Sequence, residues 1–231
     1  MFRGDPQGTK IQRGLLFLGL LLPRLYVILD AGLMREPAAE LARKLIASGV
    51  EVLQYRAKNV PAKEMLSRAR ELAAVARRAG ARFFVNDRPD MAYLAGAHGV
   101  HVGQDDLGVE EARVLVGPDA WVGLSTHNIE QFERAARSSA DYIAVGPIFA
   151  TTSKASADPI VGLHLIRRAR RLTKRPIVAI GGITLERAAE VIEAGADSVA
   201  VISDILGVDD PVSRAREYLR RLQAAEPAAN H

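Results

Sequence analysis

The 231-residue sequence contains no cysteine. Disulfide bonds, a thiolate nucleophile and a zinc–thiolate site are therefore excluded, and the absence fits a protein of the reducing cytoplasm. Aromatic residues make up only 5% of the chain, too few for a surface that stacks nucleic-acid bases. The apolar run at 15–22 has eight residues and is followed by Pro23, well short of the roughly 20 residues of a membrane-spanning helix. We expect a globular protein with neither a nucleic-acid nor a membrane partner.

The charge of the chain is close to balanced. Lys and Arg number 31 against 27 Asp and Glu, which gives a net charge of +4. The densest basic run, at residues 167–171, overlaps an apolar stripe formed by Leu165, Ile166, Ala169 and Leu172. Such a pattern is typical of a helix that buries one face and exposes the other to solvent. The positive charge therefore does not indicate nucleic-acid binding.

A small residue followed by Gly recurs before apolar, β-branched runs, as at Gly49, Gly80, Gly96 and Gly195. Gly just past a helix tolerates the left-handed conformation that ends it, so the repetition predicts alternating helices and strands. Predicted strands span 25–29, 52–56, 82–86, 99–102, 121–125, 142–145, 177–180 and 198–202. Predicted helices span 37–48, 62–79, 89–94, 108–116, 129–137, 162–172, 185–193 and 211–223. This α/β pattern favours a single (β/α)8 TIM barrel, with a doubly wound open sheet as the alternative.

The two ends of the chain are predicted to lie outside the eight units. Basic residues precede the apolar run at 15–22, as in a secretory signal peptide, but no small-residue cleavage site follows. We expect residues 1–24 to be an N-terminal extension over the far end of the barrel, or the product of an upstream start codon. Residues 25–223 would form the barrel, and residues 224–231 a short flexible tail.

Two acidic residues follow neighbouring strands of the predicted barrel. Asp87 comes directly after the strand at 82–86, and Asp106 follows the strand at 99–102. Because parallel strands end at the same edge, the two carboxylates should meet there, and paired hard oxygens suit Mg²⁺. The alternative is that each Asp only caps the helix that follows it.

Cationic residues should lie at the same edge. Along the strand at 52–56 side chains alternate, so Gln54, Arg56 and Lys58 share one face, and buried cations there need an anionic partner. After the fifth strand, Ser125 and His127 share a face, and we expect hydrogen-bonding roles rather than a catalytic triad. These groups predict a cationic, metal-ready site large enough for a diphosphate.

A second anion site is predicted across the barrel mouth. The long loop after the sixth strand carries Thr151, Thr152, Ser153 and Lys154, and its length suits a lid as well as an ordinary surface loop. Gly182 and Ser203 follow strands seven and eight, where barrels commonly bind a monophosphate through backbone N–H groups. Two anion sites without a nucleophile between them predict departure of a Mg²⁺-bound diphosphate, with a second phosphorylated molecule as acceptor.

Seven motifs stand in order along the chain: QYRAK (54–58), VND (85–87), HVGQDD (101–106), GLSTH (123–127), DYIAVGPIFATTSK (141–154), AIGGI (179–183) and AVIS (200–203). In this order they resemble the thiamine-phosphate synthase family, over roughly residues 25–219. The resemblance implies a TIM barrel and a transferase. The expected reaction joins 4-amino-2-methyl-5-(diphosphooxymethyl)pyrimidine to a thiazole phosphate, forming thiamine phosphate and diphosphate. Ala150 departs from the pattern, since relatives often have Pro there.

The resemblance also assigns residues. It implies that Asp87 and Asp106 bind Mg²⁺, and that Lys154, Arg56 and Ser125 are catalytic. Implied contacts to the pyrimidine diphosphate are Gln54, Tyr55, Arg56, Ala57, Lys58, Asn86, Ser125 and Lys154. Implied contacts to the thiazole phosphate are Thr151, Thr152, Ser153, Gly182, Ile202 and Ser203.

Two other functions remain open at this point. A related thiazole tautomerase uses a His after the fifth strand of the same barrel, and His127 fits that enzyme too. The paired carboxylates and the cations favour the synthase, because an isomerase acting on a monophosphate has no diphosphate to neutralise. A non-catalytic binder of thiamine precursors is the third alternative. The partners expected are small-molecule substrates, and a homo-oligomer is neither indicated nor excluded.

Overall fold

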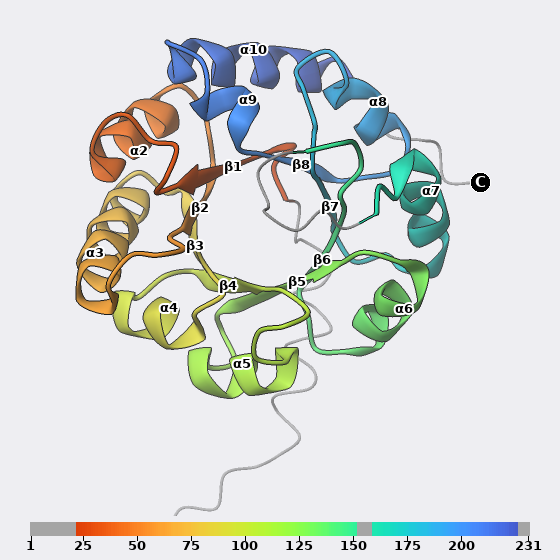
Figure 1. Ribbon diagram of the computed structural model, residues 1–231, viewed down its shortest axis with the longest axis horizontal. Helices are drawn as coiled ribbons and strands as arrows, with labels where there is room; N and C mark the ends of the chain where they lie inside the picture. The colour runs from red at the N-terminus through yellow and green to blue at the C-terminus, as the bar shows by residue number, and fades with distance from the viewer. Residues whose placement is uncertain (1–21, 152–158, 226–231) are drawn as a thin grey trace, which may run out of the picture.

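The computed structural model describes residues 22–151 and 159–225. Its strands are parallel and form a closed barrel in chain order (Figure 1). Closure is made by β1 and β8, in which Leu25 pairs with Val199 and Val27 pairs with Val201. The TIM-barrel prediction is confirmed, and the open doubly wound sheet is not formed. The strands are β1 (Leu25–Asp30), β2 (Val52–Arg56), β3 (Arg82–Asn86), β4 (Gly99–Val102), β5 (Trp121–Thr126), β6 (Tyr142–Val145), β7 (Ile177–Ile180) and β8 (Ser198–Val201).

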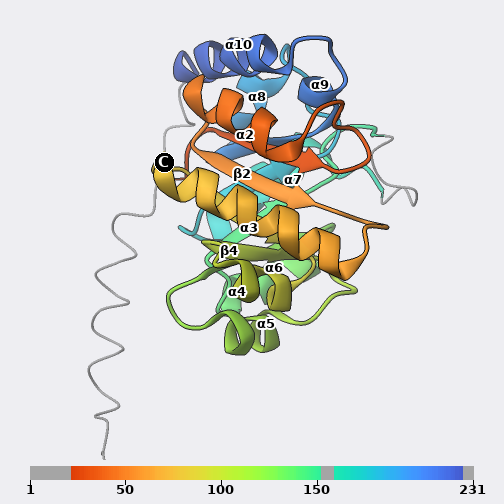
Figure 2. The ribbon, with the colours of Figure 1, turned by 90° about the vertical axis from the view of Figure 1, so that its left-hand side faces the viewer.

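The helices form a ring outside the barrel (Figures 1 and 2). They are α2 (Ala38–Ala47), α3 (Ala62–Arg78), α4 (Pro89–Ala95), α5 (Val109–Val116), α6 (Ile129–Arg137), α7 (Gly162–Leu172), α8 (Ala188–Glu193), α9 (Ser203–Leu206) and α10 (Pro211–Gln223). The sequence did not predict α9, because a single turn is too short to show a helical period. Among the described helices, none is both long and apolar enough to cross a bilayer.

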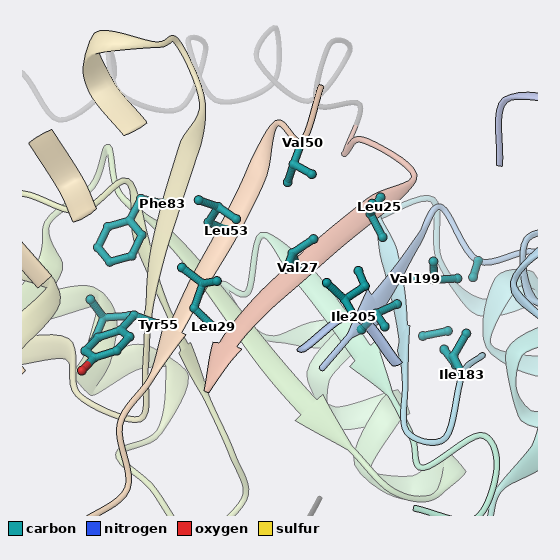
Figure 3. Packing of buried hydrophobic residues seen from close by; sticks show 14 of the residues in the cluster. Leu25, Val27, Leu29, Val50, Leu53, Tyr55, Phe83, Ile183, Val199 and Ile205 are labelled. Atoms are coloured by element: carbon teal, nitrogen blue, oxygen red, sulfur yellow. The ribbon is translucent and has the colours of Figure 1, made fainter. Parts of the chain in front are cut away.

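Alternation along the strands divides the core into two layers. Val27 and Leu29 of β1 face the helices and join an outer cluster with Tyr55 and Phe83 (Figure 3). The intervening residues of each strand point into the barrel, as expected for period-two side chains. The inner cluster consists of Leu22, Tyr26, Ile28, Val52, Phe84, Tyr142, Ala144, Val178 and Ala200.

At the amino-terminal end of the barrel, two carboxylates are paired within the protein. Asp141 accepts a hydrogen bond from the N–H of Val122 at 2.7 Å and pairs with Arg113. Asp197 accepts from the N–H of Ile177 at 2.7 Å and from Arg170 at 2.7 Å. Each carboxylate therefore joins the start of one strand to the helix before it. Because these charges are paired within the protein, we interpret this end of the barrel as stabilising the fold rather than binding a ligand.

The residues just before β1 belong with the barrel. Leu22 is only 5% exposed and packs in the inner cluster. The carbonyl of Arg24 accepts a hydrogen bond from the N–H of Val199 at 2.8 Å. Within the described residues, barrel packing therefore includes residue 22, slightly before the predicted boundary at residue 25. The rest of the predicted extension lies outside the described residues.

Candidate active site

A cavity of about 500 Å³ lies at the carboxyl ends of the strands. Every strand of the barrel contributes at least one side chain to its wall. Its volume falls within the range of small-molecule sites in proteins, about 300–1,000 Å³. The position is the one expected for a TIM-barrel active site.

Most of the predicted site residues line this cavity. Those that do are Gln54, Arg56, Lys58, Asn86, Asp87, Asp106, Ser125, Thr151, Gly182, Ile202 and Ser203. Tyr55 and Ala57 do not, because they alternate to the other face of β2 and its extension: Tyr55 is fully buried in the outer cluster, and Ala57 packs against that cluster. Thr152, Ser153 and Lys154 lie outside the described residues.

The structure brings Asp87 and Asp106 together, as their positions on neighbouring strands predicted. The backbone of Asp87 has φ +64°, a left-handed conformation that is uncommon for residues other than Gly. Its N–H donates to the carbonyl of His101 at 2.7 Å, which fixes the turn after β3 to β4. The N-cap residues of α4 and α5 are Arg88 and Gly108, and neither makes a side-chain cap. The helix-capping alternative for the two acids is therefore not what the structure shows.

The two carboxylates repel each other. Burial raises the pKa of Asp87 from 3.8 to about 6, and the charge and hydrogen bond of Asp106 add to this shift. Lys58 and Arg56 lower that pKa only in part. Asp106 is held in place because Oδ2 accepts from the N–H of Gly103 at 2.7 Å. A pair of partly buried oxygens with uncompensated charge fits a hard divalent cation.

The described residues do not offer a complete metal cage. Among them, no group of three or more acidic, His or Cys side chains could hold an ion. Two carboxylates with room beside them suit Mg²⁺, which keeps several waters and takes further ligands from substrate phosphates. The donor set therefore fits a Mg²⁺ ion that a phosphorylated ligand helps to hold.

The described wall is less cationic than the sequence indicated. Asp87, Asp105 and Asp106 line the cavity, against Arg56 and Lys58. A diphosphate entering this wall would meet more like charge than opposite charge. A divalent cation would supply the positive charge that the described side chains do not.

Sequence reasoning missed Asp30, which ends β1. Its carboxylate pairs with Arg56, and both side chains are largely buried. Its Oδ1 also accepts from the N–H of Gly32 at 2.9 Å. Arg56 therefore has an internal partner that fixes its orientation toward the cavity. Tyr26, Ile28 and Asp30 alternate inward on β1, and this period could have identified the residue.

A chain of buried hydrogen bonds crosses the cavity floor. Gln54 Nε2 donates to the hydroxyl of Tyr26 at 3.0 Å, which lies 3.1 Å from the hydroxyl of Tyr142. His101 Nδ1 lies 3.0 Å from Tyr142, and its Nε2 lies 2.8 Å from Ser125 Oγ. Burial raises the pKa of both tyrosines, so both stay protonated.

The order of donors along this chain assigns the His101 tautomer. If each hydroxyl accepts from one neighbour and donates to the next, Tyr142 donates to Nδ1 and the Nε2–H of His101 donates to Ser125. Ser125, which lines the cavity, then does not use its own hydroxyl hydrogen toward His101. Sequence reasoning missed His101 because its partners come from β5 and β6, and no local motif shows that they meet.

His127 is held at the cavity wall. Its Nδ1 lies 2.6 Å from the carbonyl oxygen of Gly146, and its backbone N–H donates to Gln131 Oε1 at 2.6 Å. Since a carbonyl only accepts, Nδ1 carries the hydrogen. These contacts fit a positioned hydrogen-bonding residue.

The predicted phosphate side borders a smaller hollow. Its wall consists of Ala150, Thr151, Gly182, Ile183, Thr184, Ser203 and Asp204. Gly182 has φ +63°, and a Cβ there would lie 2.3 Å from the carbonyl oxygen of Ala150. The sequence suggested that this Gly admits a phosphate. The structure adds a second reason, since the glycine lets the loop after β6 pack directly on the turn after β7.

Comparisons with known proteins agree with this geometry. The model of the family described as thiamine monophosphate synthase matches residues 25–205. A thiamine-phosphate synthase of Koribacter versatilis is 53% identical over 211 residues, covering 89% of this chain and 99% of the relative. One from Chloroflexus aurantiacus is 46% identical over 195 residues, covering 84% of this chain and 90% of the relative.

A solved structure gives the same result. The thiamine phosphate pyrophosphorylase of Pyrococcus furiosus has a TM-score of 0.80 and 33% identity to this chain, covering 87% of this chain and 96% of that one. The family resemblance predicted from the seven motifs is confirmed by sequence and by fold. This chain belongs to the thiamine monophosphate synthase family.

Proposed function

We propose that this protein is a thiamine-phosphate synthase that uses Mg²⁺. It would join 4-amino-2-methyl-5-(diphosphooxymethyl)pyrimidine to a thiazole phosphate, releasing diphosphate. The observation that carries the proposal is the carboxylate pair Asp87 and Asp106 beside Arg56 and Lys58, at the mouth of a cavity of suitable size. This combination suits a diphosphate substrate that a divalent cation helps to hold.

The metal site would be formed by Asp87 and Asp106. When bound there, Mg²⁺ supplies positive charge to the diphosphate and so makes it a better leaving group. Arg56, oriented by Asp30, and Lys58 would hold the diphosphate oxygens. Lys154 would add a third positive charge from the loop after β6.

The other predicted residues would bind the two organic parts. Gln54, Asn86 and Ser125 would contact the pyrimidine diphosphate, with Ser125 donating the hydrogen that His101 leaves available. Thr151, Thr152, Ser153, Gly182, Ile202 and Ser203 would contact the thiazole phosphate. Tyr55 and Ala57 have no side-chain route to the cavity, so any contribution from them would come from the backbone.

The chemistry proposed is a dissociative substitution. The bond between the pyrimidinyl methylene carbon and the diphosphate oxygen breaks, and its electron pair leaves with the diphosphate. The thiazole nitrogen then supplies the electron pair of the new carbon–nitrogen bond. The residues of this chain hold both partners in line and exclude water, so no covalent intermediate with the protein is required.

The test is direct. Purified protein is incubated with both substrates and Mg²⁺, and thiamine phosphate and diphosphate are measured, with excess chelator as the control. We expect equal amounts of both products, and none with chelator. Isomerisation of the thiazole phosphate without product would instead identify a tautomerase, and binding without turnover would identify a binder. A cytoplasmic location and small-molecule partners stay part of the proposal.

A further inference from the structure

The C-terminal helix reaches the phosphate side of the cavity from outside the barrel. Helix α10 lies along α8 and α9 (Figure 1), and its Tyr218 is completely buried. The Tyr218 hydroxyl lies 2.7 Å from Oδ2 of Asp204 and 3.2 Å from the carbonyl oxygen of Ile183. Ile183 follows β7, and Asp204 belongs to α9, which follows β8. One hydroxyl group therefore lies between the two loops that border the phosphate side.

The carboxylate of Asp204 is anchored by several groups. Its Oδ2 also accepts from the N–H of Leu185 at 3.2 Å, and Nη1 of Arg214 lies 3.8 Å away. Burial, followed by the hydrogen bond to Asp204, raises the pKa of Tyr218 well above its ordinary value, so its hydroxyl stays a donor. A carboxylate that borders a phosphate site would repel the ligand unless its charge were already engaged. Here Tyr218, Leu185 and Arg214 engage it.

We propose that Tyr218 and Asp204 form a positioning pair, which holds the turn at Gly182 and Ile183 against Ser203 at the separation that binds the thiazole phosphate. The inference rests on the proposed function and deepens it, because it names residues that act through the phosphate loops without touching substrate. Tyr218 lies outside residues 25–205, which the family model matches. Asp204 lies within that matched range, so the pair joins the matched region to the C-terminal helix.

The physical argument concerns preorganisation. Backbone N–H groups and a hydroxyl bind a phosphate well only if they are held at the right separation before the ligand arrives. The two loops here follow different strands, and Gly181 and Gly182 both have positive φ values. Without the Tyr218 hydroxyl, Asp204 loses its shortest hydrogen bond, and its remaining bond to the loop after β7 is the longer one from the N–H of Leu185. The pyrimidine side would keep its geometry, because β2, β3 and β4 take no part in this contact.

The experiment compares KM values for the two substrates in wild type and in Tyr218→Phe. Phe keeps the buried ring and removes only the hydroxyl. We expect the KM for thiazole phosphate to rise about tenfold, equivalent to about 1.4 kcal/mol. The KM for the pyrimidine diphosphate should stay within about twofold and kcat near wild type, since both depend on the other side of the cavity. Asp204→Ala should show the same pattern, and the double variant should be no worse than either single variant.

Two matched variants test whether Asp204 acts by positioning the phosphate loops or only by stabilising the fold. Asp204→Asn keeps an acceptor for Tyr218 and Leu185, so it should retain the affinity that Asp204→Ala loses. Asp197→Asn alters a similarly bonded Asp at the far end of the barrel, so it should lower the melting temperature without changing the ratio of the two KM values.

Three results would overturn the proposal. They are an equal rise of both KM values in Tyr218→Phe, an unchanged KM for thiazole phosphate, and a loss in Asp204→Asn as large as in Asp204→Ala. If wild type formed no thiamine phosphate, the proposed function would fail separately. Calorimetric titration of thiazole phosphate into wild type and Tyr218→Phe would then decide the positioning role, since unchanged affinity, or no binding to wild type, would contradict it.

Discussion

The two ends of the barrel use the same residue type in opposite ways. At the amino-terminal end, Asp141 and Asp197 each receive a backbone N–H and an Arg side chain. At the carboxyl-terminal end, Asp87 and Asp106 face each other, and burial together with Asp106 raises the pKa of Asp87 to about 6. At the amino-terminal end the carboxylates are paired within the protein. At the carboxyl-terminal end Asp87 and Asp106 keep negative charge that a bound cation could neutralise.

The difference assigns stability to the amino-terminal end of the barrel and ligand binding to the carboxyl-terminal end. The matched carboxylates stabilise the folded chain and need no ligand. The unmatched pair should lower the stability of the folded chain when no cation is bound, as expected of a site preorganised for a charged partner. Asp87 also has a left-handed backbone conformation, which adds conformational strain at the same end of the barrel. Substitutions at the two ends should therefore have opposite consequences.

The largest effect is expected for Asp87→Asn. The amide keeps the size of the side chain and removes a charge from the metal site. Turnover should fall about a hundredfold or more, the loss of about 3 kcal/mol typical of one preorganised electrostatic group. Steady-state kinetics at saturating Mg²⁺ measure it, and Asp106→Asn should behave alike.

The same variant tests the separation of the two anion sites. Strands β3 and β4 lie across the barrel from β7 and β8 (Figure 1). At physiological ionic strength charges are screened over about 8 Å. Calorimetry should therefore show near-normal affinity for thiazole phosphate in stably folded Asp87→Asn. A similar loss for both ligands would mean that the two sites are one.

The next effect concerns stability at the other end. In Asp141→Ala, the N–H of Val122 loses its acceptor, and Arg113, whose side chain is only 12% exposed, loses its charged partner. We expect the free energy of unfolding to fall by about 2 kcal/mol or more. Denaturant titration measures this, while both KM values should stay unchanged well below the melting temperature. Unaltered stability would mean that the matched carboxylate contributes little.

The sequence predicts features that depend on neighbouring residues and misses those that depend on contacts between distant segments. Strand and helix periods and the Gly stops are local, so they placed the eight units and brought Asp87 and Asp106 to one edge. The partnership of Asp30 with Arg56, the contacts of His101 and the position of Tyr218 depend on packing between distant segments. The close approach of Gly182 to Ala150 is of the same kind. No local period encodes such contacts.

A smaller effect is expected in the pH dependence of stability without metal. The folded-state pKa of Asp87, about 6, lies above its ordinary value of 3.8, so protonation stabilises the folded form. That stabilisation is complete below about pH 4 and is lost as the pH rises through 6. Unfolding measured in chelator should show this decline in wild type and a shallower one in Asp87→Asn. Parallel curves for the two proteins would show that the carboxylate pair is not strained.

The smallest effect is expected for removal of residues 2–21, which we predict to lie outside the eight units. Activity and melting temperature should remain close to wild type, because the described packing begins at Leu22. Leu22→Ala provides the contrast, since emptying a buried leucine site typically costs about 2–5 kcal/mol. Thermal unfolding and the standard assay on both variants give the measurement. If the deletion lowered stability as much as Leu22→Ala, the N-terminal segment would itself be part of the closed end of the barrel. That end would then owe its stability to the segment as well as to its matched carboxylates.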